Sequence, residues 1–162
     1  MDRGLTDIGL LLEPINMEKY DYIRLNREEQ WVAVIPPDSP LAKLEYITPE
    51  DLRGMPLILP RRLNVQSELA RWFGDEFEKL NVVFTSNLPS NSSIMVHHGL
   101  ACSLIIQGSI SFWDKEKIVY RPLSPRLTAT SVLAWKRKQP FGLAAEKFIK
   151  YMKENLHTGQ VD

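Results

Sequence analysis

The chain has 162 residues, an apolar fraction of 44% and a formal net charge of zero at pH 7. It is long enough to bury a core as one domain or two small lobes, and its neutrality argues against a general attraction to nucleic acid or anionic membrane. Cys102 is the single cysteine, which excludes an internal disulfide and favours a reducing compartment. No apolar run approaches the roughly 20 residues that span a bilayer, and the N-terminus lacks a signal-peptide pattern. We therefore expect a soluble, cytoplasmic, globular protein.

The first predicted element is a strand. Ile8–Leu12 is a short apolar run ended by Glu13 and Pro14, which is typical of a strand buried on both faces. Such a strand needs a neighbour on each side. The following stretch, Asn16 to Gln30, is polar and bears tyrosines, and Trp31–Ile35 is the next predicted strand, stopped by two prolines.

Two helices and a strand follow in the middle of the chain. Thr48, Pro49, Asp51 and Gly54 have the spacing of a short capped helix. Leu57–Leu59 predicts a buried strand. Asn64 then offers an N-cap for a long helix, one face of which carries a row of large apolar side chains: Leu69, Trp72, Phe73, Phe77 and Leu80.

Strands and helices alternate through the rest of the chain. Val82–Thr85 predicts a strand, and a short helix begins near Ser90–Ser93 and ends at Gly99. The segments LACSLII, KIVYRPL and Ser131–Lys136 predict three further strands. A final helix opens at Pro140 and carries an apolar stripe of Ala145, Phe148, Ile149 and Met152. This order favours an α/β fold with a mainly parallel sheet.

The residues offer little support for catalysis. His97 and His98 are helix neighbours that point about 100° apart, so they are poorly placed to share a metal ion. Cys102 lies in an apolar run, GSISF lacks the second glycine of a nucleophile elbow, and phosphate-loop and dinucleotide fingerprints are absent. The basic run WKRKQ at 135–139 is better explained as a solvated strand end than as a nucleic-acid contact. We predict no enzyme activity, no metal and no cofactor.

Two loops could bind a ligand. Pro60, Arg61 and Arg62 follow a predicted strand and precede a helix start at Asn64, while Ser86 and Asn87 follow the next strand. In open α/β sheets, ligands bind beyond the carboxyl ends of strands, and a helix N-terminus with arginines favours an anion. The alternative stays open that Asn64 and Ser90–Ser93 only cap helices and that the arginines are solvated.

A family resemblance runs through most of the chain. Several stretches, taken in chain order, resemble the effector-binding domain of LysR-type transcriptional regulators. They are GLTDIGLL, YDYIRLNREEQWVAVIPPDSPLA, ITPEDLRGMPLILP, VHHGLACSLII and VYRPLSPRL, followed by VLAWKRKQP and AAEKFIKYM. The likeness is collinear over nearly all of residues 4–155. It implies a fold similar to type 2 periplasmic binding proteins, with one complete lobe, residues 24–125, and one incomplete lobe, residues 4–23 and 126–155. Residues 156–162 are expected to be a frayed tail.

The resemblance also implies a site and a mechanism. Hinge crossings are expected near Asn26–Trp31 and Pro122–Thr128. The expected cleft residues are Pro60, Arg61, Arg62, Asn64, Val65, Asn87, Glu13 and Pro14. The implied function is allosteric sensing of a small-molecule effector, for which the two arginines favour an organic anion. The implied regulator binds DNA through an N-terminal helix-turn-helix absent from this chain and forms homo-oligomers.

Two expectations and two rival functions complete the sequence interpretation. The chain is expected to be an N-terminally truncated part of a longer regulator, so that Ile8–Leu12 lacks its usual partners. An exposed strand edge there predicts dimerisation or looseness of the first lobe. A solute-binding protein of a transporter shares the fold, and a bilobal α/β enzyme is a second rival, although no acid–base pair is evident.

Overall fold

The computed structural model describes residues 1, 4–110, 113–114 and 116–156. Two segments considered above lie outside them: the expected tail from His157 onward, and Ser111 and Phe112 of the GSISF segment. The chain divides into two compact units, the first formed by Met1–Glu28 and Thr130–Asp162 and the second by Glu29–Ala129. The boundaries expected from the sequence stood at 23/24 and 125/126. The observed boundaries fall within two strands: β2 (Tyr20–Ile35) contains the first, after Glu28, and β7 (Thr128–Lys136) contains the second, after Ala129.

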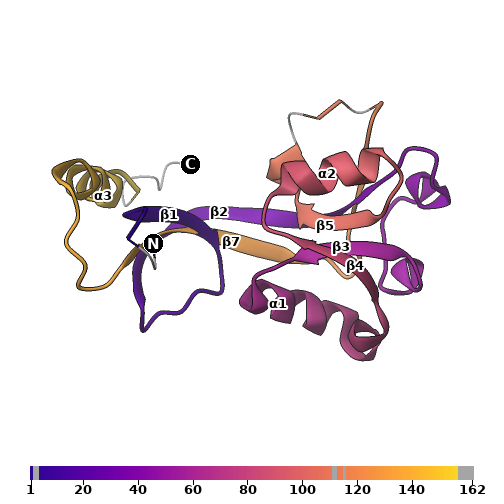
Figure 1. The fold of residues 1–162 in the computed structure, drawn as a ribbon, viewed down its shortest axis with the longest axis horizontal. Coiled ribbons are helices and arrows are strands. Elements are labelled where there is room, and N and C mark those ends of the chain that lie inside the picture. Colours follow the sequence, from indigo (N-terminus) through magenta and orange to yellow (C-terminus); the bar gives the residue numbers. More distant parts are fainter. Residues whose placement is uncertain (2–3, 111–112, 115, 157–162) are drawn as a thin grey trace. The chain divides into compact units, whose positions relative to one another are not determined.

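In the first unit, β1 (Ile8–Leu12) pairs antiparallel with β7, so that Leu10 lies opposite Leu133. The other neighbour of β7 is β2. Helix α3 (Leu143–Leu156) places its buried residue Ile149 in the core of this unit, which also contains Ile23, Leu133 and Trp135 (Figure 1). The helix begins at Leu143 rather than at the predicted Pro140.

The prediction that β1 is buried on both faces was wrong. Leu10 is 65% exposed, whereas its neighbours in the strand are partly buried. Within the described residues β1 has one strand partner, β7, so a continuous apolar run here does not produce a fully enclosed strand. An apolar run of five residues cannot by itself distinguish a central strand from an edge strand.

The second unit is built on a mixed sheet. β5 (Cys102–Ile106) and β6 (Val119–Pro122) flank the second half of β2, and both pair with it antiparallel. β3 (Pro56–Pro60) runs parallel to β5 on one side and to β4 (Asn81–Ser86) on the other. The expectation of a mainly parallel sheet therefore holds for β3, β4 and β5 and fails for β2 and β6.

Helices cover both faces of this sheet. α1 (Leu63–Phe73) connects β3 to β4, and α2 (Pro89–His97) connects β4 to β5; the two helices lie on opposite faces (Figure 1). Beneath α2, the buried residue Val96 joins a cluster with Val32, Val34, Ile105, Ile110 and Ile118. All five residues of β5 are buried, as expected for a strand covered on both sides.

Helix ends follow local sequence signals in part. Thr48 and Asp51 form the reciprocal capping bonds predicted from their spacing: Thr48 N donates to Asp51 Oδ2 at 2.8 Å and Asp51 N donates to Thr48 Oγ1 at 3.3 Å. α1 ends at Phe73 because Gly74 adopts φ +59°, so Phe77 falls in a separate 3-10 segment, Gly74–Lys79, instead of continuing the helix.

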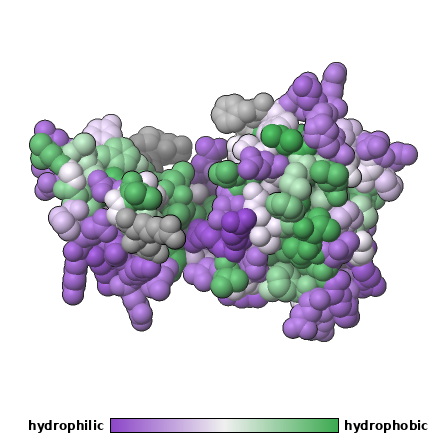
Figure 2. Space-filling view, viewed as in Figure 1, coloured by the Kyte–Doolittle hydropathy of each residue, from purple (hydrophilic) through white to green (hydrophobic). Residues whose placement is uncertain are grey.

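The surface of the second unit is not uniformly polar. β4 is the last strand on its side of the described sheet, and Val82, Val83 and Phe84 are 41–54% exposed. Figure 2 shows hydrophobic patches between hydrophilic side chains on the visible face. No helix in the described part of the chain is both long and apolar enough to cross a membrane.

Candidate functional site

The loops after β3 and β4 lie next to each other because the two strands are parallel and stay paired up to their last residues. Pro60 is paired with Ser86 at the last position of the ladder. Arg61 follows directly: its backbone N donates to Ser86 O at 3.3 Å, and its Nη2 donates to Thr85 O at 3.4 Å. Pro60, Arg61 and Asn87 are thereby gathered at the carboxyl edge of the sheet, where open α/β folds bind ligands.

Helix α1 starts at this edge. Leu63 is its first residue and Arg62, in an extended conformation, is its N-cap, with no side-chain capping bond. The predicted N-cap role of Asn64 was therefore wrong, and Asn64 is an exposed residue of the first turn. The first turn contains no acidic residue, so the partial positive charge of the helix end is not offset by a carboxylate of the same turn.

The backbone of this loop is fixed by one long polar side chain. Gln66 Nε2 donates to Pro60 O at 2.6 Å, and Gln66 N donates to Arg62 O at 2.9 Å. Gln66 was not among the residues singled out from the sequence; its position one turn after the loop was the available signal. Val65 is only 3% exposed and packs in the core with Leu69 and Phe73, so it supports the helix from inside.

The second loop, around Asn87, is held by a serine turn. Ser86 Oγ accepts a hydrogen bond from Leu88 N at 3.1 Å, and Leu88 is the N-cap of α2 with Pro89 as the first helical residue. The helix start predicted at Ser90–Ser93 was thus a few residues late. Asn87 is exposed at the tip. Two serines of α2, Ser92 and Ser93, are buried.

Glu13 and Pro14 lie in the first unit, directly after β1. Glu13 N donates to Thr130 O at 2.9 Å. Its carboxylate accepts two hydrogen bonds from Arg24, from Nε at 2.8 Å and from Nη2 at 2.7 Å. Glu13 raises the pKa of Arg24 through this hydrogen bonding and its negative charge. Sequence reasoning missed Arg24, because a partner eleven residues away across a turn leaves no local pattern.

Cys102, His97 and His98, which the sequence analysis considered for catalysis or metal binding, lie in β5 and at the end of α2 rather than in these loops. Cys102 is buried, and burial raises the pKa of its thiol to about 11, which keeps it neutral and unreactive. His97 Nδ1 lies 3.1 Å from Lys117 O, and its ring centre is 5.1 Å from that of His98. Among the described residues, no group of three or more histidine, cysteine, aspartate or glutamate side chains is arranged to hold a metal ion.

Comparison with known proteins identifies the family. The model of the LysR substrate binding domain matches residues 1–157, and the chain belongs to this family. These domains have the type 2 periplasmic-binding-protein-like fold, which agrees with the mixed α/β architecture found here. The fold class and the family resemblance stated from the sequence are therefore confirmed.

Individual relatives are regulators. The Hca operon transcriptional activator HcaR of Escherichia coli (strain K12) is 28% identical over 158 residues, which cover 95% of this chain and 52% of HcaR; the chain thus spans about half the length of this curated relative. HinK, a LysR family transcriptional regulator from Pseudomonas aeruginosa, superposes with a TM-score of 0.69 at 22% identity, over 96% of this chain and 55% of HinK. The regulatory domain of CcmR from Synechocystis PCC6803, solved in complex with 2-PG, gives a TM-score of 0.68 at 14% identity, over 95% of this chain and 75% of that domain.

Proposed function

We propose that this chain is the effector-sensing part of a cytoplasmic LysR-type transcriptional regulator, and that it acts by binding rather than by catalysis. The observation that carries the proposal is the family match over residues 1–157 of a chain that folds as two compact units. In the whole regulator, a separate DNA-binding region and assembly into homo-oligomers complete the function. Effector binding shifts the equilibrium between conformations with different DNA contacts.

The effector in this proposal is a small organic anion, bound at the carboxyl edge of β3 and β4. Three features of this edge support an anion: the exposed side chain of Arg61, the neighbouring Arg62, and the start of α1 with no acidic residue in its first turn. Pro60, Asn64 and Asn87 would line the same edge, with Val65 shaping it from below. The solved complex of the related CcmR domain with 2-PG is consistent with a small ligand in this fold.

Glu13 and Pro14 are proposed as the contribution of the first unit. Because Arg24 occupies both carboxylate oxygens of Glu13, an anionic effector meets a neutralised pair there rather than a bare negative charge. The pair can also re-form with different geometry when the effector binds, which would link ligand contact to the conformation of the first unit.

A ligand screen on variant chains tests this proposal. Thermal unfolding of the chain is followed with a panel of small carboxylates, phosphorylated acids, amino acids and sugars, since specific binding to the folded state raises Tm. We expect a saturable rise with one class of anion, and an affinity about tenfold lower in Arg61→Gln. Arg71→Gln, on the exposed side of the same helix and paired with Glu68, is the matched control and should bind normally.

The regulatory part of the proposal needs the longer protein. In the full-length regulator, the anion that stabilises the chain should change the operator footprint, and Arg61→Gln should shift the concentration at which this change occurs. A footprint that is the same with and without every stabilising anion would contradict the sensing function. A normal response in Arg61→Gln and Arg62→Gln would contradict only the anion site at the edge of β3 and β4.

A further inference from the structure

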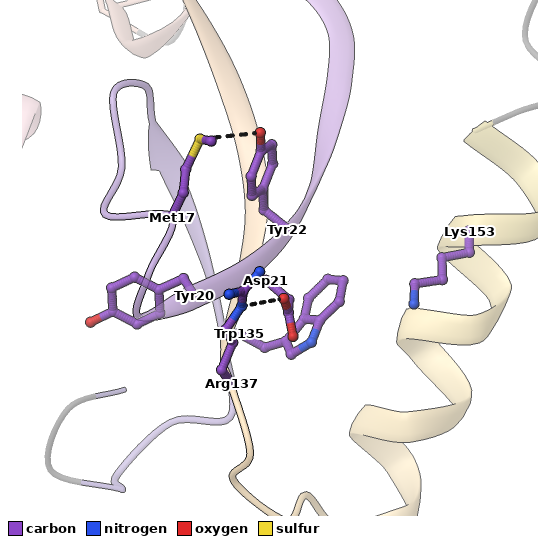
Figure 3. A pocket seen from close by; sticks show the side chains of 7 residues that line it. All are labelled: Met17, Tyr20, Asp21, Tyr22, Trp135, Arg137 and Lys153. Atoms are coloured by element: carbon purple, nitrogen blue, oxygen red, sulfur yellow. Dashed lines mark hydrogen bonds and ion pairs between the residues drawn. The ribbon is translucent and has the colours of Figure 1, made fainter.

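The first unit contains a hollow of about 470 Å³ that none of the expected cleft residues lines. Figure 3 shows it between the start of β2, the end of β7 and helix α3. Its walls carry three aromatic side chains, Tyr20, Tyr22 and Trp135, and three charged ones, Asp21, Arg137 and Lys153. This volume is within the range of small-molecule sites, about 300–1,000 Å³.

Arg137 is oriented by two contacts. Its backbone N donates to Lys19 O at 3.0 Å, and its Nε donates to Asp21 Oδ1 at 2.7 Å. Within the described part of the chain, the terminal nitrogens Nη1 and Nη2 make no hydrogen bond with protein atoms. Arginine can donate two parallel hydrogen bonds to a carboxylate, so a guanidinium already fixed through Nε presents its other edge with little further loss of freedom.

Helix α3 adds a second cation next to one of the aromatic rings. Lys153 Nζ, on α3, lies 5.2 Å from the centre of the Trp135 ring, and Figure 3 shows its side chain extending from the helix toward that ring. Trp135 is only 6% exposed and belongs to the core of the first unit, so its ring is a rigid wall. Tyr22 is restrained too, because its hydroxyl donates to Met17 Sδ at 3.6 Å.

The charges of the lining favour an anion. The lining has two cations, Arg137 and Lys153, and one carboxylate, Asp21, which forms an ion pair with Arg137 at 2.7 Å, so the formal charge of the lining is positive by one. Aromatic walls in turn favour a ligand with a flat apolar body. The basic run WKRKQ, unexplained by the proposed function, thereby acquires a role, because its first and third residues, Trp135 and Arg137, line the hollow.

We propose that this hollow binds a small aromatic carboxylate, whose carboxylate accepts hydrogen bonds from Arg137 and is attracted by Lys153, while its ring packs against the tyrosines and Trp135. The site lies within one unit and is separate from the edge of β3 and β4. It does not depend on the proposed function: it can bind whether or not the other edge senses an effector.

Nuclear magnetic resonance of the 162-residue chain tests the site directly. The indole N–H of Trp135 is followed while 2-naphthoate is added, and naphthalene-2-methanol serves as the uncharged probe of similar shape. We expect a saturable shift of the Trp135 indole with 2-naphthoate, and binding at least tenfold weaker for the alcohol. Arg137→Gln and Lys153→Gln should each weaken 2-naphthoate binding about tenfold. Lys150→Gln, one turn away on α3 and outside the lining, is the matched control.

Three results would overturn the proposal. The first is an unchanged Trp135 indole at millimolar 2-naphthoate. The second is equal binding of the alcohol and the carboxylate, or unchanged binding in both charge variants, either of which would exclude the anion role of Arg137 and Lys153. The third is a shift confined to the amides of Arg61 and Asn64, which would place the anion at the effector edge and so support the proposed function while removing this second site.

Discussion

Glu13 and Arg24 form a two-point ion pair, in which Nε and Nη2 of the arginine donate to the two carboxylate oxygens at 2.8 and 2.7 Å. The pair ties the residue after β1 to the middle of the first half of β2. Arg24 also lies over the ring of Tyr22, with its guanidinium carbon 5.9 Å from the ring centre. The side chains of Glu13, Arg24 and Tyr22 thus restrain one another within the first unit, and Glu13 is one of the residues expected at the effector cleft.

The Glu13–Arg24 pair should be visible through the arginine itself. In the wild-type chain we expect the Arg24 Nε–H to exchange slowly with water, because a charge-assisted hydrogen bond holds it. Glu13→Gln removes the negative charge and should accelerate this exchange severalfold, as measured from the arginine side-chain resonances. Glu18→Gln, in the exposed turn between β1 and β2, is the control; an equal acceleration there would show that the pair is not maintained in solution.

Helix α1 should depend on its buried face. Leu69 is fully buried and Leu63 is 76% exposed, although both are leucines of the same helix. We expect Leu69→Ala to lower the free energy of unfolding by about 2–5 kcal/mol, since it leaves a cavity. Leu63→Ala should change it by less than about 0.5 kcal/mol. Urea denaturation measures both, and similar losses for the two variants would contradict the packing described here.

The end of α1 should require glycine. Gly74 has φ +59° and ψ −136°, a backbone conformation that other residues adopt only with strain. We expect Gly74→Ala to destabilise the fold by about 1–3 kcal/mol, although open space surrounds the added methyl group. Gly142→Ala, where φ is not positive and the space is equally open, should cost less than about 1 kcal/mol. Equal effects would show that strain at Gly74 is not the cause.

Ser93 should be replaceable without loss. Its hydroxyl is buried and, among the described residues, has no hydrogen-bond partner. Because an unsatisfied buried hydroxyl costs about 1–3 kcal/mol, Ser93→Ala should leave stability unchanged or raise it by up to about 2 kcal/mol. The neighbouring Ser92 Oγ donates to Leu88 O at 3.5 Å, so Ser92→Ala is the matched comparison and should not stabilise. A clear loss in Ser93→Ala would indicate that the hydroxyl has a partner in solution.

Cys102 should make stability fall at high pH. Burial raises the thiol pKa to about 11 in the folded chain, while an unfolded chain has an ordinary thiol pKa of about 8.5. Above the ordinary value the unfolded state loses its proton first, so this contribution to stability declines between pH 8.5 and about 11. Cys102→Ala lacks the thiol and therefore this contribution to stability. The difference in urea midpoint between the wild-type chain and Cys102→Ala should therefore change with pH in that interval. A constant difference would contradict the raised pKa.

Part of this structure was predictable from short stretches of sequence. The capping bonds between Thr48 and Asp51, the strand within Pro56–Pro60 and the end of α2 near Gly99 depend on residues within a few positions of each other. The family resemblance also needed only the order of such motifs. Local hydrogen bonding and apolar spacing determine these features, so they can be recognised before the chain is folded.

Other features depended on partners distant in the chain. The polar residues at the start of β2 form a strand because β7, about a hundred residues later, lies beside them, and the side chain of Leu10 is 65% exposed although it stands in an apolar run. Antiparallel pairing of β2 with β5 and β6, the Glu13–Arg24 pair and the hollow beside Trp135 have the same origin. The sequence alone determined the family, most of the elements and the loops where an anion is expected. Only the tertiary structure decided which faces are buried and which charges meet, because burial and ion pairing arise from residues that approach one another after folding.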